Sequence, residues 1–208
     1  MQIDIRAMEL LASRLCHDLV SPVSAINNGV ELVQDIGGTV VDEAMKLIGD
    51  SAVHAAHRLR LFRASYGRAG GEENFPIRDA RHIAEQYLAG GKVNLTWPED
   101  QPSEEFAAHR GVLKVMLNML IMSEEILAYG GTVTVRSVPN GSRFEIAGRN
   151  AQVNPTIEAA LAGTTGVEEL TPRSIQAYIT GKFAAHFELK LTHEQPVTDR
   201  LDMILATA

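Results

Sequence analysis

The residues best suited to do chemistry in this sequence are His17 and its neighbour Asp18, near the N-terminus. An exposed imidazole is a nucleophile that can accept a phosphoryl group through one ring nitrogen. An acidic neighbour can accept the proton of the other ring nitrogen, which fixes the tautomer and increases nucleophilicity. Pro22 follows about one turn later, and an internal proline removes a backbone hydrogen bond and bends a helix. We therefore take His17 and Asp18 as candidate catalytic residues for phosphoryl transfer.

The helix that carries His17 is predicted to present it to solvent. Apolar residues recur three or four positions apart from Met8 to Val33, which predicts an amphipathic helix over residues 3 to about 36. The apolar seam includes Leu15 and Leu19, whereas His17 lies on the opposite, polar face. A surface histidine without function is the common alternative. The acidic neighbour, the proline and the hairpin described next favour function.

A second helical seam follows a glycine-rich break. Gly37-Gly38 ends the first helix, Thr39 can cap the second, and apolar residues then recur from Val41 to Phe62. One hairpin of two amphipathic helices cannot bury both seams, whereas two hairpins can do so as a four-helix bundle. We therefore predict a parallel homodimer whose stem is formed by residues 1–68.

The second predicted domain, residues 75–208, follows a glycine-rich linker and mixes helices with antiparallel strands. This pattern predicts an α+β fold with a layered C-terminal domain. The predicted elements are a helix over 77–89, a strand over 92–97, an apolar helix from about 103 to 129, a hairpin of strands 132–138 and 142–146 around Asn140-Gly141, helices beginning after the caps Asn154 and Thr171, and strands over 187–192 and 200–206.

The composition limits the partners and compartment of the chain. With 208 residues, 45% hydrophobic and 22% charged, it is typical of a globular protein, and a net charge of −7 argues against binding nucleic acid. No apolar run reaches the length of about 18 residues that a membrane span needs, and the N-terminus lacks a signal-peptide pattern, so we expect a cytoplasmic protein without a membrane partner. The single cysteine, Cys16, excludes an intrachain disulfide. His54 and His57 have a spacing that zinc tolerates, but no third ligand accompanies them, so we predict no metal site.

Two stretches of sequence carry a family resemblance. His17-Asp-Leu-Val-Ser-Pro22 resembles the H-box of histidine kinases. The longer run from Leu15 to Leu32, which includes Asn27-Asn-Gly29, is similar more narrowly to the ChpT family of alphaproteobacterial histidine phosphotransferases. The resemblance extends along the whole chain, including Leu170–Tyr178. It implies a dimeric helical hairpin forming a four-helix bundle, followed by an α/β sandwich that resembles the histidine kinase ATPase domain without working as one.

The residues that an ATP site needs are replaced at the positions this resemblance matches. In the stretch 118–125, Met122 stands where kinases have a Mg²⁺-binding asparagine, and Glu125 stands where they have a phosphate-binding lysine. A thioether does not ligate Mg²⁺, and a carboxylate repels triphosphate. The stretch 147–151 lacks the aspartate and glycines of the adenine loop, and the interval before Thr171 is too short for an ATP lid. We therefore expect no ATP binding and no cofactor bound by this chain.

The residues and the resemblance together predict a histidine phosphotransferase. It would relay a phosphoryl group between receiver-domain aspartates through phospho-His17, with Mg²⁺ held by the receiver. The resemblance implies a hybrid kinase of the CckA kind as donor and response regulators such as CtrA and CpdR as acceptors, in control of the cell cycle. Two alternatives stay open, an ATP-dependent kinase with an aberrant nucleotide site and a non-catalytic dimeric adaptor. Helix geometry predicts a docking surface for the receiver formed by Val20, Ser24, Asn27, Asn28, Arg58 and Leu61.

Overall fold

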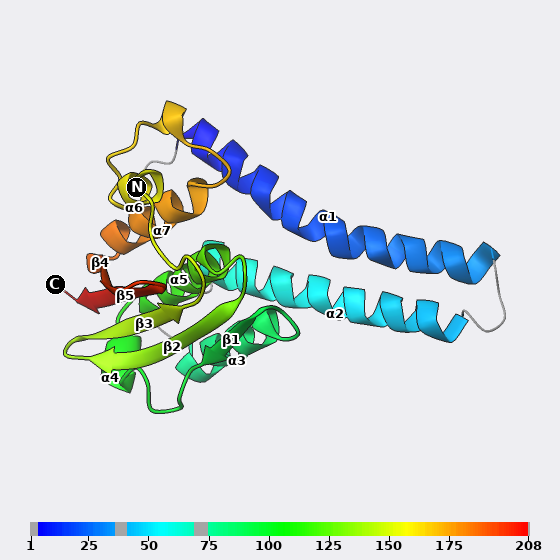
Figure 1. Ribbon diagram of the computed structural model, residues 1–208, viewed down its shortest axis with the longest axis horizontal. Helices are drawn as coiled ribbons and strands as arrows, with labels where there is room; N and C mark the ends of the chain where they lie inside the picture. The colour runs from blue at the N-terminus through cyan, green and yellow to red at the C-terminus, as the bar shows by residue number, and fades with distance from the viewer. Residues whose placement is uncertain (1–3, 36–40, 69–74, 208) are drawn as a thin grey trace.

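Two long helices form an antiparallel hairpin at one end of the molecule (Figure 1). They are α1 (Ile5–Asp35) and α2 (Val41–Tyr66), in a computed structural model that describes residues 4–35, 41–68 and 75–207. The predicted glycine break at Gly37-Gly38 and the Thr39 cap lie outside the described residues, as does most of the predicted linker. None of the helices in the described part of the chain is both long enough and apolar enough to cross a bilayer.

The two helices of the hairpin approach each other closely at Gly29. This glycine is buried, and a Cβ atom added to it would lie 2.6 Å from Cγ1 of Ile48 on α2. Pro22 lies inside α1, which continues as one helix past it. Figure 1 shows the axis of α1 changing direction roughly midway along its length, as expected for an internal proline.

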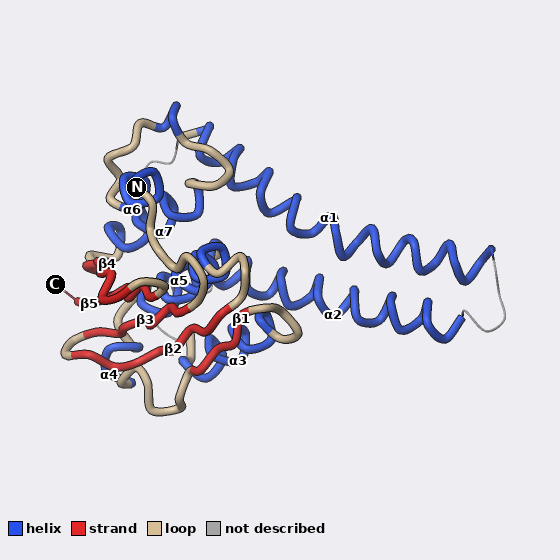
Figure 2. The backbone as a smooth tube through the Cα atoms, viewed as in Figure 1, coloured by secondary structure: helices blue, strands red, loops and turns tan. Residues whose placement is uncertain are grey.

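The rest of the chain builds a five-stranded sheet with helices packed against it (Figure 2). The strand order is β1-β2-β3-β5-β4, with β1 parallel to β2 and the other neighbours antiparallel. This arrangement confirms the predicted α+β class. The elements are α3 (Ile77–Leu88), β1 (Val93–Thr96), α4 (Glu104–Ala107), α5 (Val112–Ile126), β2 (Gly131–Val138), β3 (Gly141–Ala147), α6 (Pro155–Leu161), the short 3₁₀ helix η3 (Val167–Glu169), α7 (Ile175–His186), β4 (Leu189–Val197) and β5 (Arg200–Thr207).

Local sequence signals explain where two of these elements turn or begin. Asn140 adopts φ 54° between the hairpin strands β2 and β3, a left-handed conformation that asparagine tolerates, and the predicted hairpin is confirmed. The side chain of Asn154 accepts the N–H of Ile157 at 3.0 Å and caps α6, as predicted.

The single helix predicted from about 103 to 129 is wrong. The chain forms α4 and α5 instead, and Gly111 separates them with φ +81°, a conformation that favours glycine. A Cβ atom at this position would meet the ring of Phe187, which packs against the glycine from a distant part of the chain. The helical pattern is interrupted at this glycine, and the contact with Phe187 is a tertiary feature that no local pattern reveals.

The predicted start of the last helix is also corrected. Thr171 and Pro172 lie in a turn, and α7 begins at Ile175 with Ser174 at the N-cap position. The hydroxyl of Ser174 accepts the N–H of Thr171 at 3.0 Å, and the carbonyl of Thr171 accepts the N–H of Ile175 at 3.0 Å. These hydrogen bonds close the turn, and α7 therefore begins three residues later than a start at Pro172 would give.

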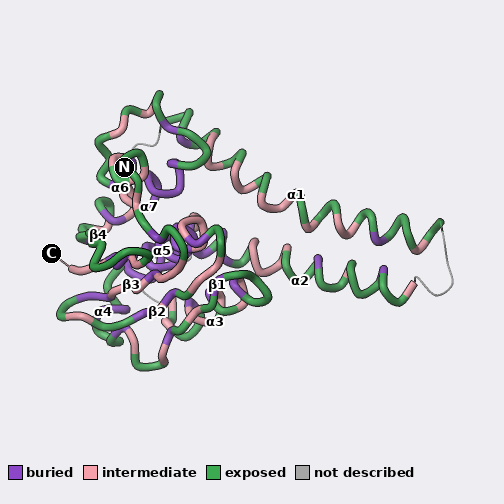
Figure 3. The backbone as a smooth tube through the Cα atoms, in the orientation of Figure 1, coloured by how far each residue is buried: buried purple, intermediate pink, exposed green. Residues whose placement is uncertain are grey.

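Helix α5 forms the centre of the core (Figure 3). Every residue from Val112 to Ser123 is buried, and the helix contacts both α2 of the hairpin and β5 of the sheet. Such an element buried on all sides is expected to be apolar around its whole circumference. The hairpin and the C-terminal elements are thereby joined through one shared core.

A buried chain of hydrogen bonds adds a polar link between the hairpin and the C-terminal elements. The hydroxyl of Tyr66 on α2 donates to Oε1 of Gln176 on α7 at 2.6 Å. Nε2 of Gln176 donates to Oδ1 of Asn118 on α5 at 3.0 Å, and Nδ2 of Asn118 donates to the Ser65 carbonyl at 2.9 Å. Breaking a buried bond of this kind leaves an unsatisfied group that costs about 1–3 kcal/mol. We call these four residues the hydrogen-bonded chain.

Candidate functional site

His17 lies on α1 with its side chain 88% exposed, as predicted. Its Nδ1 atom is 3.4 Å from Oδ1 of Asp18, so the Nδ1–H group can donate to the carboxylate. Nε2 has no protein partner among the described residues. This arrangement leaves the lone pair of Nε2 available to an incoming electrophile.

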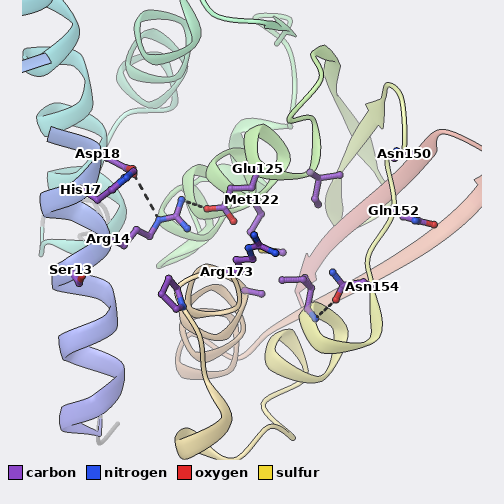
Figure 4. A pocket seen from close by; sticks show the side chains of 14 residues that line it. Ser13, Arg14, His17, Asp18, Met122, Glu125, Asn150, Gln152, Asn154 and Arg173 are labelled. Carbon is purple, nitrogen blue, oxygen red and sulfur yellow. Dashed lines mark hydrogen bonds and ion pairs between the residues drawn. The ribbon is translucent and has the colours of Figure 1, made fainter. Parts of the chain in front are cut away.

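Asp18 is held in a much less exposed position than His17. Its side chain is 21% exposed, and its second oxygen, Oδ2, lies 4.0 Å from Nε of Arg14, one turn earlier on α1. Arg14 also pairs with Glu125 at the end of α5. The three charged side chains therefore link the helix that carries His17 to the C-terminal elements (Figure 4).

Two tyrosines complete the surroundings of Asp18. Burial raises the pKa of the Tyr66 phenol, and the nearby charge of Asp18 raises it further although Arg14 opposes this. Burial also raises the pKa of the Tyr87 phenol, which donates a hydrogen bond to Glu124. Both phenols are neutral at physiological pH, so neither adds a negative charge beside Asp18. The guanidinium paired with Asp18 within the described residues is that of Arg14.

His17 lies at the edge of a cavity of about 740 Å³ between α1 and the C-terminal elements (Figure 4). Sequence reasoning did not place these elements near His17. A partner that reaches the histidine therefore meets two surfaces, one on the hairpin and one beside the cavity. The cavity is lined by Ser13, Arg14, His17 and Asp18 of α1, by Met122, Glu125 and Ile126 of α5, and by Asn150, Gln152, Asn154, Ile157, Pro172, Arg173 and Ala177.

The cavity contains the residues that the resemblance matches to a kinase nucleotide site. Met122 contributes a buried thioether, and both acidic residues of the lining, Asp18 and Glu125, contact Arg14. Mg²⁺ requires oxygen ligands, and a carboxylate already paired with a guanidinium is a poor ligand for it. The residues present therefore do not fit a Mg²⁺–triphosphate group.

The predicted docking residues divide into two groups. Val20, Ser24, Asn27 and Asn28 are exposed on α1. Arg58 is half-buried on α2, with its guanidinium carbon 5.4 Å from the ring centroid of Tyr87.

Leu61 is wrongly predicted as a docking residue. Its exposed fraction is 0%, and it belongs to the core cluster that the hairpin shares with the C-terminal elements. The prediction considered only the seam between α1 and α2. Near its end α2 is also covered by α3 and α5, which bury a second face of the helix.

Sequence reasoning also missed Arg14 and Arg173 as site residues. The spacing of Arg14 and Asp18 is an i,i+4 ion pair, which could have been recognised on the predicted helix. The contact of Arg14 with Glu125 and the position of Arg173 at the cavity depend on the tertiary fold, so no local signal identifies them.

The histidines of α2 lie apart from this site. His54 is exposed, and His57 is half-buried, with no hydrogen-bond partner for its Nδ1 among the residues that the structure describes. Within the ranges that the structure describes, no three histidine, cysteine or acidic side chains are grouped as metal ligands.

Known proteins share both the sequence and the architecture of this chain. The family model for the histidine phosphotransferase C-terminal domain matches residues 77–199. Protein phosphotransferase ChpT of Brucella abortus (strain 2308) is 33% identical over 188 residues, which cover 88% of this chain and 87% of that protein. A solved structure of a bacterial phosphotransferase matches with a TM-score of 0.76 and 28% identity, covering 99% of this chain and 98% of the other. The family matches, together with the exposed histidine and its acidic partner, show that this chain belongs to the ChpT-type histidine phosphotransferases.

Proposed function

We propose that this protein relays phosphoryl groups between receiver-domain aspartates through His17. The observation that carries the proposal is the orientation of the imidazole, with Nδ1 directed at Asp18 and Nε2 open to solvent. An imidazole held in this way is prepared for attack by one defined nitrogen. Membership of the histidine phosphotransferase family supports the same reaction.

The transfer step follows from this geometry. The lone pair of His17 Nε2 attacks the phosphorus of a phosphoaspartate, and a P–N bond forms as the P–O bond to the aspartyl carboxylate breaks. The electron pair of the broken bond leaves on that carboxylate. Asp18 accepts the Nδ1 proton in a hydrogen bond and stabilises the positive charge that develops on the ring. The same steps in reverse deliver the phosphoryl group to a second receiver, and Mg²⁺ bound by the receiver would neutralise the equatorial oxygens.

The partners we propose are receiver domains of a CckA-like hybrid kinase and of CtrA-like and CpdR-like response regulators. They would dock on the exposed residues Val20, Ser24, Asn27 and Asn28 of α1 and on the half-buried Arg58 of α2. A receiver that brings its phosphoaspartate to His17 also comes within reach of Arg173 at the cavity. An exposed guanidinium there can attract the acidic, phosphorylated face of the partner.

The active form we propose is a homodimer. Met8, Val23 and Val30 belong to the predicted seam of α1, yet all three are exposed in the single chain, and Leu59 of α2 is exposed as well. A second copy that pairs its hairpin with this one would cover such side chains in a four-helix bundle. The proposed dimer uses the hairpin and leaves the cavity beside His17 to the partner.

We expect this protein to take its phosphoryl group from another protein rather than from ATP. The pairing of Glu125 with Arg14 and the thioether of Met122 support this expectation. The experiment is to mix the purified protein with a receiver domain carrying labelled phosphate, and in parallel with labelled ATP and Mg²⁺. Label should pass from the receiver to the wild type and not to His17→Gln, while His82→Gln, which changes an exposed histidine on α3, should behave as the wild type.

The other outcomes identify the alternatives. Label that arrives from ATP in the absence of any receiver would favour an ATP-dependent kinase with an aberrant nucleotide site. A receiver that binds wild type and His17→Gln equally and labels neither would show a non-catalytic adaptor.

A further inference from the structure

Arg14 occupies the central place among the charged residues beside His17. Its side chain is only 15% exposed, and it contacts a carboxylate on each side (Figure 4). One contact, with Asp18, lies within α1, and the other, with Glu125, reaches α5 of the C-terminal elements. An ion pair removed from bulk water is screened less than a surface pair, so the attraction between its charges is stronger.

The two oxygens of Asp18 have different neighbours. Oδ1 is 3.4 Å from Nδ1 of His17, whereas Oδ2 is 4.0 Å from Nε of Arg14. At this distance Nε of Arg14 makes no hydrogen bond with Asp18, and among the described residues it has no other hydrogen-bond partner. The electrostatic attraction between the guanidinium and Oδ2 nevertheless favours the orientation of the carboxylate in which Oδ1 is directed at the imidazole. Without the guanidinium, the carboxylate would be free to turn toward solvent, because His17 itself is highly exposed and offers it little support.

Glu125 gives Arg14 a fixed attachment point outside its own helix. It lies one residue before the end of α5, whose residues from Val112 to Ser123 are all buried, and the hydrogen-bonded chain links that helix to α2. The side chain of Glu125 is 30% exposed. The resemblance expects a phosphate-binding lysine at position 125. Glu125 stands there instead and pairs with Arg14, the arginine beside His17.

We propose that Arg14 is a positioning residue for phosphotransfer, anchored by Glu125 and acting on His17 through Asp18. The proposal rests on the proposed function, because it concerns the same histidine. It assigns the C-terminal elements a part in the reaction, which is to hold the guanidinium that orients Asp18. Arg14 does not touch the phosphoryl group in this account.

The test compares rates of phosphotransfer from a labelled receiver domain to full-length variants. Arg14→Gln should slow transfer to His17 by roughly 10–100-fold, the usual loss when a group that orients a reactive residue is removed. Arg14→Lys keeps the charge and should recover part of the rate. Glu125→Gln should slow transfer less than Arg14→Gln does, and adding it to Arg14→Gln should cause no further loss, because Glu125 acts through Arg14.

A matched control is available on the same helix. Arg6 also joins α1 to the C-terminal elements, since its guanidinium lies 3.9 Å from Glu168 and 3.5 Å from the Leu170 carbonyl, but it is three turns away from His17. Arg6→Gln should transfer at the wild-type rate. If Arg6→Gln slowed transfer as much as Arg14→Gln, the loss would come from weaker packing of α1 against the C-terminal elements. The positioning role of Arg14 would then be wrong.

A spectroscopic readout separates the two proposals. The ¹⁵N shifts of the His17 ring report the fraction of the tautomer protonated at Nδ1, and this fraction should fall in Arg14→Gln and not in Arg6→Gln. Equal tautomer fractions and equal rates in wild type and Arg14→Gln would overturn the positioning role while leaving phosphotransfer intact. Failure of the wild type itself to accept label would instead overturn the proposed function.

Discussion

At the level of single residues, the reactivity of His17 depends on the carboxylate next to it in the sequence. Adjacent helical side chains diverge, yet the structure brings Oδ1 of Asp18 to 3.4 Å from Nδ1 of His17. That contact leaves Nε2 as the nitrogen that can attack a phosphoryl group. The carboxylate, and not only the imidazole, therefore belongs to the proposed reaction centre.

Replacing Asp18 by asparagine tests this role. The amide keeps the shape of the side chain but carries no charge to stabilise the developing imidazolium, so transfer should slow by roughly 100-fold or more. Binding of the receiver should change little. Glu9→Gln, which neutralises an exposed acid elsewhere on α1, serves as the control, and a wild-type rate in Asp18→Asn would remove Asp18 from the mechanism.

The sequence predicted these two residues because their chemistry is local. His17 and Asp18 are neighbours on one helix, and a helical pattern is enough to predict that the imidazole faces solvent. Glu125 could not be recognised as a partner of Arg14, because the two come together only after α5 has packed against the hairpin. Leu61 was misplaced for the same reason, since the elements that bury it are distant in the sequence.

At the level of the elements, local turn chemistry was a correct guide at Asn140 and Asn154 but not at Thr171, where the chain forms a turn before α7 begins. Asn140 and Asn154 use their own side chains or backbone to shape a turn and a cap, so the hairpin and the start of α6 were predicted correctly. The break at Gly111 was missed, and the ring of Phe187 that packs against this glycine comes from a distant part of the chain. The hairpin also exposes apolar side chains, which the helices of a second copy would bury.

Charge introduced on the predicted seams should weaken the proposed dimer. Val23→Glu combined with Leu59→Glu would place carboxylates in the bundle core, where each unpaired charge costs several kcal/mol, so the dimer should weaken by roughly 100-fold or more. Light scattering after size-exclusion chromatography measures the mass. Val197→Glu, which changes an exposed apolar residue of β4, should stay dimeric, and a monomeric wild type would exclude the proposed bundle.

At the level of the whole molecule, the hairpin and the C-terminal elements together line the cavity beside His17. The cavity beside His17 takes its walls from α1, α5 and the segments near α6 and α7, so the histidine is exposed to solvent yet flanked by a second wall. The shared core and the hydrogen-bonded chain hold the hairpin and the C-terminal elements together. This arrangement suits a protein that receives the phosphoryl group from a folded partner domain.

The measurement that tests the account most directly follows label between two receiver domains. A donor receiver carrying labelled phosphate is mixed with an acceptor receiver, and this protein is added as wild type or as His17→Gln. The account predicts that label reaches the acceptor rapidly with the wild type, appears transiently on this protein, and does not reach the acceptor with His17→Gln. Label that passes equally well with His17→Gln, or that never passes through the wild type, would contradict a relay through His17.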